Sequence, residues 1–139
     1  SIQRKGSHYA SGALIDKKWI LTSAGPFYNL LESTKLLKAR IGSVNNKKGG
    51  VVVPIKEIVV HPWYINMRPS NDLALLRIAS PVTVTDDHIL PISISSAKGQ
   101  ILNAKFQTTY WSRLIGDIFK TGLSLVLLVV LKYSLEEVV

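Results

Sequence analysis

Few side chains in this sequence could carry acid-base or metal chemistry, because it holds three histidines and no cysteine. A thiolate nucleophile, a disulfide and a cysteine-based metal site are therefore excluded. An imidazole close to a carboxylate could act as a general base near neutral pH. His61 precedes Asp72 by eleven residues and stands directly before Pro62, at the end of a β-rich run. That setting favours a structural or exposed histidine over a base.

The other two histidines offer weaker chemistry. His88 follows Asp86 and Asp87, and these three side chains could hold a metal ion weakly. Zinc sites use three or four convergent ligands, so a solvated turn is the favoured interpretation. His8 stands beside Tyr9 and indicates a strand position only. We predict no metal site and no cofactor.

The composition predicts a folded domain. Hydrophobic residues make up 47% of the 139 residues, enough to form a core and too many for a disordered chain. The longest apolar run, residues 123–131, has nine residues. A helix that crosses a bilayer needs roughly 18 to 20, so no membrane span is predicted. The chain opens without methionine or an apolar leader, which is typical of a processed or trimmed chain.

Basic residues exceed acidic residues by 17 to 9, which gives a formal net charge of +8. This excess favours acidic partners such as glycosaminoglycan, nucleic acid or anionic membrane. The three tryptophans are not interleaved with the lysines, which argues against a nucleic-acid site and leaves an acidic polysaccharide. Solvated loop charge is the alternative. The candidate polyanion-binding residues are Lys17, Lys18, Lys35, Lys38, Arg40, Lys47 and Lys48.

Short β-rich runs separated by Gly, Pro, Asn, Asp and Ser indicate an antiparallel barrel or sandwich. Asp16-Lys17-Lys18 predicts a short hairpin loop, and residues 45–50 supply Asn and Gly for positive φ. Pro54 lacks an N–H and is expected at an edge or a bulge. The expected strands are residues 1–4, 11–15, 19–23, 38–41, 51–61, 72–78 and 105–110.

Three stretches stand out by their residues and their order: residues 8–15, His-Tyr-Ala-Ser-Gly-Ala-Leu-Ile; residues 19–26, Trp-Ile-Leu-Thr-Ser-Ala-Gly-Pro; and residues 71–76, Asn-Asp-Leu-Ala-Leu-Leu. In this order they resemble the amino-terminal barrel of the trypsin-like serine protease family. The first is similar to the segment where that family has an aromatic residue, a cysteine, two glycines and an apolar strand. The second resembles the segment that normally ends Ala-Ala-His-Cys, and the third is nearly identical to the family's aspartate motif. The resemblance covers about residues 1–111.

The resemblance also implies which functional residues are missing. Gly25 stands where the family carries its general-base histidine, and Asp72 stands at the position of the triad aspartate. Ala10 and Pro26 occupy the two half-cystine positions of one disulfide, so base and disulfide are absent together. No Gly-Asp-Ser-Gly-Gly nucleophile motif occurs. Because the triad needs an imidazole to take the nucleophile's proton, we expect no peptidase activity and a structural hydrogen-bonding role for Asp72.

The fold implied is all-β, an antiparallel Greek-key β-barrel of the trypsin-like type. We expect residues 1–104 to form the amino-terminal barrel and residues 105–139 to form an interdomain segment and the first strands of an incomplete second barrel. The family is secreted, which implies an extracellular protein. The expected function is that of a non-catalytic homologue that binds a protease, an inhibitor or a protease substrate. Two alternatives stay open: a fragment of a longer trypsin-like endopeptidase or pseudoenzyme, and a binder of heparin-like polyanions.

Overall fold

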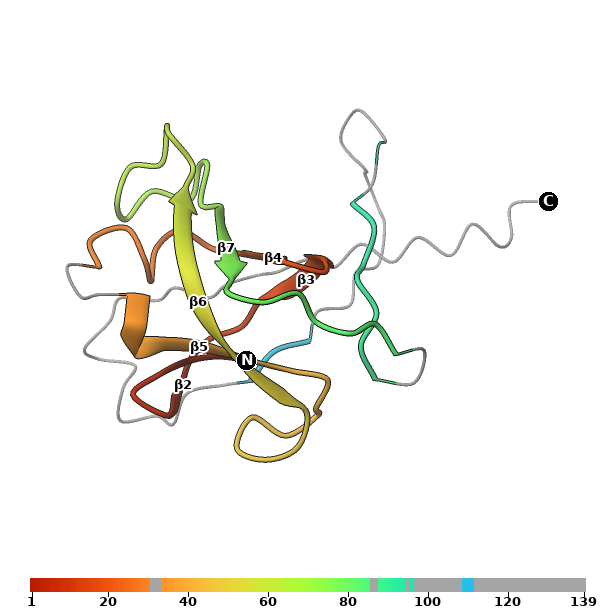
Figure 1. The fold of residues 1–139 in the computed structure, drawn as a ribbon. Helices are drawn as coiled ribbons and strands as arrows, with labels where there is room; N and C mark the ends of the chain where they lie inside the picture. The colour runs from red at the N-terminus through yellow and green to blue at the C-terminus, as the bar shows by residue number, and fades with distance from the viewer. Residues whose placement is uncertain (31–33, 86–87, 95, 97–108, 112–139) are drawn as a thin grey trace.

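The computed structural model describes residues 1–30, 34–85, 88–94, 96 and 109–111 (Figure 1). In this part of the chain the strands are all antiparallel and follow the order β2-β1-β5-β6-β7-β4-β3. Their bounds are β1 (Ile2–Arg4), β2 (Ser7–Ala10), β3 (Ala13–Asp16), β4 (Trp19–Thr22), β5 (Leu37–Ile41), β6 (Val51–Val60) and β7 (Ala74–Ile78). A 3-10 turn, η1 (Thr34–Leu36), leads into β5. The expected all-β antiparallel fold is confirmed.

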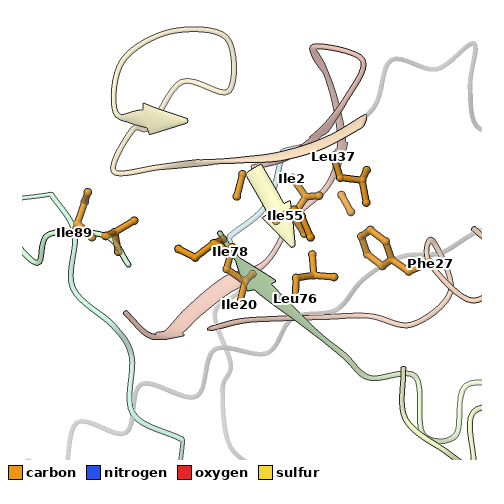
Figure 2. Packing of buried hydrophobic residues seen from close by; sticks show 11 residues of the cluster. Ile2, Ile20, Phe27, Leu37, Ile55, Leu76, Ile78 and Ile89 are labelled. Atoms are coloured by element: carbon orange, nitrogen blue, oxygen red, sulfur yellow. The ribbon is translucent and has the colours of Figure 1, made fainter. Parts of the chain in front are cut away.

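The core is built from alternate residues of these strands, because successive side chains of a strand point to opposite faces. In β7 the residues Ala74, Leu76 and Ile78 are buried and the two between them are half-buried. Figure 2 shows the apolar side chains from several strands packed against one another. The buried cluster comprises Ile2, Ala10, Ile20, Phe27, Leu37, Ala39, Ile55, Leu76, Ile78, Val82 and Ile89.

Strand β6, the longest among the described residues, joins the two halves of the sheet. Residues Val51 to Pro54 pair with β5, whereas residues from Ile55 onward pair with β7. Pro54 is therefore the last residue that pairs with β5, directly before the strand changes partner. A shift in the pairing register with β7 follows between Ile55 and Glu57. The position of Pro54 tolerates a residue without an N–H, and it agrees with the expectation of a bulge near Pro54.

Two predicted turns are present. Lys17 and Lys18 form a two-residue loop between β3 and β4, and the Lys18 N–H donates to Asp16 Oδ1 at 3.0 Å. In the loop between β5 and β6, Gly49 and Gly50 have φ of 75° and 61°. Glycine adopts such values without the steric penalty that other residues meet.

The structure corrects the expected strand at residues 11–15. The strand starts at Ala13, and a separate strand, β2, lies before it and pairs with β1. Gly12 stays outside both strands and lies so close to Ile20 that a Cβ would clash with its side chain. Most of the expected strand 105–110 lies outside the described residues, and its last two residues are not in a strand. The expected domain boundary at residue 104 also lies outside them.

Candidate functional site

The corner after β4 positions Gly25. Thr22, the last residue of β4, is buried and donates its hydroxyl to the Ser11 carbonyl oxygen at 2.8 Å. A turn follows, in which the Phe27 N–H donates to the Ala24 carbonyl oxygen at 2.8 Å. Ala24 and Phe27 are both buried. The chain therefore holds Gly25 in a tight turn, between two residues that are packed in the protein interior.

Asp72 reaches the same corner from the start of β7. Strands β4 and β7 pair, and the partner of Thr22 is Ala74, two residues after Asp72. Asn71 has a φ of 58°, and the Leu73 N–H donates to its carbonyl oxygen at 2.7 Å, so the backbone turns sharply around Asp72. The N–H of Gly25 donates to Asp72 Oδ1 at 2.8 Å. The two positions singled out in the sequence are thus in direct contact.

Two tyrosines lie beside this pair. Tyr64 is buried, and its ring contacts that of Tyr28 edge to face with 5.2 Å between centroids. Burial of the phenol, followed by the negative charge of Asp72, raises the pKa of Tyr64 above its usual value of 10. Both effects favour the neutral phenol over the tyrosinate. Ala24 and Ala74 pack against Tyr64 in a small apolar cluster.

Two of the three histidines, His61 and His8, are engaged elsewhere, and His88 is exposed. His61 Nδ1 accepts a hydrogen bond from the Trp63 N–H at 3.2 Å, and the two rings pack together. His8 bonds to the Ser1 hydroxyl through Nδ1 and to the Trp111 carbonyl oxygen through Nε2. The structure records no hydrogen bond between an imidazole and Asp72 among these residues. Within the described ranges no group of three or more His, Cys, Asp or Glu side chains could hold a metal ion.

The positions Ala10 and Pro26, which the resemblance assigns to a disulfide, are linked through their neighbours. The hydroxyl of Tyr9 donates to the Pro26 carbonyl oxygen at 2.5 Å, and the Tyr9 ring contacts that of Phe27 edge to face at 5.7 Å. Strand β2 is therefore tied to the corner without a covalent bond. Sequence reasoning missed this contact, although an aromatic residue next to Ala10 was visible.

The candidate cations divide into separate groups. Lys17 and Lys18 occupy the β3–β4 loop. The rest lie along β5, its preceding η1 turn and the β5–β6 loop: Lys35, Lys38, Arg40, Lys47 and Lys48. Sequence reasoning missed Lys56, which is exposed on β6. The lysines on β5 and β6 are brought together by strand pairing, which charge clusters in the sequence do not reveal.

The family model described as Trypsin matches residues 1–129. A trypsin from Phaedon cochleariae is 31% identical over 112 residues, which cover 80% of this chain and 43% of that protein. The vitamin K-dependent protein C of Rattus norvegicus is 36% identical over 102 residues, or 70% of this chain and 21% of that protein. The chain spans less than half the length of these relatives.

A solved structure described as kallikrein-related peptidase 10 in complex with Zn2+ superimposes with a TM-score of 0.57 at 28% identity. The match covers 72% of this chain and 44% of that one. The antiparallel strands therefore form part of a trypsin-like, chymotrypsin-fold β-barrel. The chain belongs to the trypsin family. No helix in the described part of the chain is long and apolar enough to span a membrane.

Proposed function

We propose that this chain belongs to a non-catalytic member of the trypsin family that acts by binding another protein. The observation that carries the proposal is the contact between Gly25 and Asp72, at the positions that the resemblance assigns to the general base and to its orienting aspartate. Glycine has no side chain that could take a proton from a nucleophile. The non-catalytic part of the proposal rests on Gly25, and the binding part rests on the loop between β6 and β7.

A direct test is peptide hydrolysis by the native protein, with an active trypsin as the reference. Loss of a general base alone costs about 10² to 10⁴ in rate. We expect turnover below that of trypsin by at least this factor on every peptide of a mixed-sequence library. A kcat/KM equal to that of the reference enzyme, abolished by an inhibitor of serine proteases, would show that the protein is an enzyme.

The loop between β6 and β7 supports a protein-binding role. Backbone hydrogen bonds from the Tyr64 N–H to the His61 carbonyl oxygen and from the Arg68 N–H to the Ile65 carbonyl oxygen hold it in tight turns. The loop nevertheless presents large apolar side chains to solvent, with Trp63 77% and Met67 82% exposed. An ordered loop that exposes apolar side chains is typical of a protein contact. Proteases, protease inhibitors and protease substrates are the partner classes that we propose.

Substitutions in this loop test the contact. A double variant, Trp63→Ala with Met67→Ala, removes two exposed side chains and should leave folding unchanged. We expect it to lose at least tenfold in affinity for a protein partner recovered by the wild-type chain. As a matched control, Val44→Ala changes an exposed apolar residue in the β5–β6 loop. An equal loss of affinity in the double variant and in Val44→Ala would show that the partner does not bind through the β6–β7 loop.

A second candidate function is binding of an acidic polysaccharide along β5 and β6. Lys38 pairs with Pro54, and Lys56 lies two residues further along β6, so two exposed cations stand on neighbouring strands. At the other end, the Ser43 hydroxyl donates to the Lys48 carbonyl oxygen and orders the loop that carries Lys47 and Lys48. The acidic residue of these strands, Glu57, forms an ion pair with Arg77.

Retention on heparin tests the polysaccharide proposal. Replacing Lys47 and Lys48 by serine should lower the salt concentration that elutes the protein, whereas the same change at Lys17 and Lys18 should lower it less. Both variants lose two charges, so a plain cation exchanger should treat them alike. If the two double variants also eluted from heparin at equal salt concentrations, the loss of retention would reflect net charge alone and would contradict a specific polysaccharide site.

We propose an extracellular location, supported by the membership of the trypsin family. We also propose that residues 1–104 form the amino-terminal barrel and residues 105–139 begin a second barrel. Limited proteolysis followed by mass spectrometry tests the boundary, because cleavage near residue 104 should release a stable fragment that contains strands β1 to β7. Cleavage within β4 or β7 at the same rate would contradict it.

A further inference from the structure

All of the sulfur in this chain lies at one position. The 139 residues hold one methionine and no cysteine, so Met67 carries the only sulfur atom of the sequence. Met67 lies in the loop between β6 and β7 and is 82% exposed. Peroxides oxidise thioethers that they can reach. Any oxygen that a peroxide transfers to sulfur in this chain must therefore be transferred to Met67.

The turn that carries Met67 does not favour methionine. Met67 has a φ of 65°, in the left-handed region that glycine and asparagine adopt more easily than other residues. The Arg68 N–H donates to the Ile65 carbonyl oxygen at 3.0 Å and closes the turn. Burial does not offset the steric penalty, because the side chain stands in solvent. A residue held in this way is typical of a functional surface.

Met67 shares its loop with other exposed apolar side chains. Trp63 is 77% exposed and Ile65 is 54% exposed. The Asn71 side-chain amide donates to the Trp63 carbonyl oxygen at 3.3 Å, which links the two limbs of the loop. Figure 1 shows the loop projecting past the end of β6. A thioether is flexible and apolar, so it can pack against apolar partners of many shapes.

Oxidation would change the chemistry of this loop and leave the core alone. A sulfoxide is polar, and its oxygen accepts hydrogen bonds. In the free protein water satisfies that oxygen, because Met67 is exposed and belongs to neither buried cluster. Against an apolar partner the same oxygen would lose its water without gaining a donor, which disfavours the complex.

We propose that Met67 is an oxidation site, and that its conversion to the sulfoxide by a peroxide weakens the binding of apolar partners by the β6–β7 loop. The thioether sulfur attacks one peroxide oxygen and forms an S–O bond as the O–O bond breaks. Sulfur loses two electrons to the peroxide, and the other oxygen leaves as water. The inference rests on the proposed protein-binding role of this loop and specifies how that role is regulated.

Oxygen uptake tests the site without any partner. The native protein is treated with excess hydrogen peroxide, and intact mass spectrometry counts the oxygen atoms added. We expect one atom per molecule, taken up within about threefold of the rate for N-acetylmethionine amide, because an exposed sulfur reacts as a free thioether does. Met67→Leu should take up none. A wild-type rate at least tenfold slower would show that the sulfur is shielded and would overturn the inference.

Binding of p-cresol, which stands for a tyrosine side chain, tests the consequence. The whole chain, labelled with 15N and with 13C in the methionine methyl group, gives one methionine methyl signal. We expect saturable shifts at that methyl and at the Trp63 indole N–H, with a dissociation constant on the order of tens of millimolar for so small a ligand. The oxidised protein should bind at least threefold more weakly. Methionine sulfoxide reductase should restore the affinity.

A matched control moves the sulfur to another exposed position. Val44→Met combined with Met67→Leu places it in the β5–β6 loop, where residue 44 is 97% exposed. This variant should take up oxygen at a similar rate, with equal p-cresol affinity at the Trp63 indole before and after oxidation. Equal affinity of reduced and oxidised wild type, both folded by their 15N spectra, would overturn the inference and leave the loop's binding role standing. Absence of saturable shifts in the reduced protein would overturn both.

Discussion

The backbone N–H of Gly25 donates to Asp72 Oδ1 at 2.8 Å, so these two residues are joined without any side chain at position 25. Buried and half-buried carboxylates need hydrogen-bond donors, and here the main chain of the corner supplies one. This hydrogen bond does not require an imidazole, and it supports the proposed structural role of Asp72.

Removing the Asp72 carboxylate should destabilise the fold. In Asp72→Ala the Gly25 N–H loses its acceptor in a half-buried corner, at a cost of about 1–3 kcal/mol in the free energy of unfolding. Asp16→Ala is the matched control, because Asp16 accepts a backbone N–H from Lys18 in an exposed loop. There water replaces the acceptor, and the cost should be well below that at Asp72. Urea unfolding measures both, and equal losses would contradict a structural role for Asp72.

The titration of Tyr64 should depend on Asp72. Burial and the aspartate charge both raise the pKa of Tyr64 above 10, so Asp72→Asn should lower that pKa. Because the folded-state pKa is the higher one, the unfolded state loses its proton first, and the stability contributed by the neutral phenol falls as pH rises above 10. Absorbance of tyrosinate, with Tyr64→Phe to assign the signal, measures the shift. An unchanged pKa in Asp72→Asn would mean that the charge does not reach the phenol.

Alanine substitutions at two glycines with positive φ, Gly50 and Gly6, distinguish the cost of a steric clash from the cost of backbone strain. Gly50 has a φ of 61°, and a Cβ there would collide with the Ile41 carbonyl oxygen. Gly6 has a φ of 81°, and a Cβ there would meet no atom within 4 Å. Both alanine variants carry a conformational cost of about 1–2 kcal/mol, but only Gly50→Ala adds a collision with backbone. Thermal unfolding should show a clearly larger loss for Gly50→Ala. Equal losses would imply that the loop before β6 moves aside freely.

Leu76 and Leu73 test the assignment of the core. Leu76 lies in β7 and is 0% exposed, whereas Leu73, just before that strand, is 48% exposed. Leu76→Ala leaves a cavity and should cost about 2–5 kcal/mol, while a surface substitution usually changes stability by less than about 0.5 kcal/mol. Urea unfolding of the two variants measures the difference. A Leu73→Ala loss as large as that of Leu76→Ala would place Leu73 in a buried contact.

The strands that form the floor of the site could be predicted from their residue types. Residues 19–23 and 72–78 were expected as strands, and the structure places β4 and β7 within those ranges, paired with each other. The short, strongly apolar runs in these two segments, and the turn residues beside them, are what predicted the strands. The contact between Gly25 and Asp72 was not predictable from either segment alone, because it depends on the register that pairs Thr22 with Ala74.

Strand β2 could not be predicted, because its turn gives a weak signal. A two-residue loop, Lys5-Gly6, separates Arg4 from its partner Ser7. Both loop residues have positive φ, 51° and 81°. Such loops favour Asn-Gly or Asp-Gly, and a lysine in the first place is not a recognisable turn residue. The polar start of β2 also lacks the alternation of a half-buried strand.

The central proposal, that Gly25 leaves the protein without a general base, is tested most directly by stoichiometric labelling with a fluorophosphonate. This reagent reacts with a serine that a neighbouring base activates. The native protein is incubated with the reagent beside an active trypsin, and intact mass spectrometry counts the adducts. We predict complete labelling of the trypsin and no adduct on this protein in the same time. One adduct per molecule of this protein, formed at the rate seen for trypsin, would contradict the account.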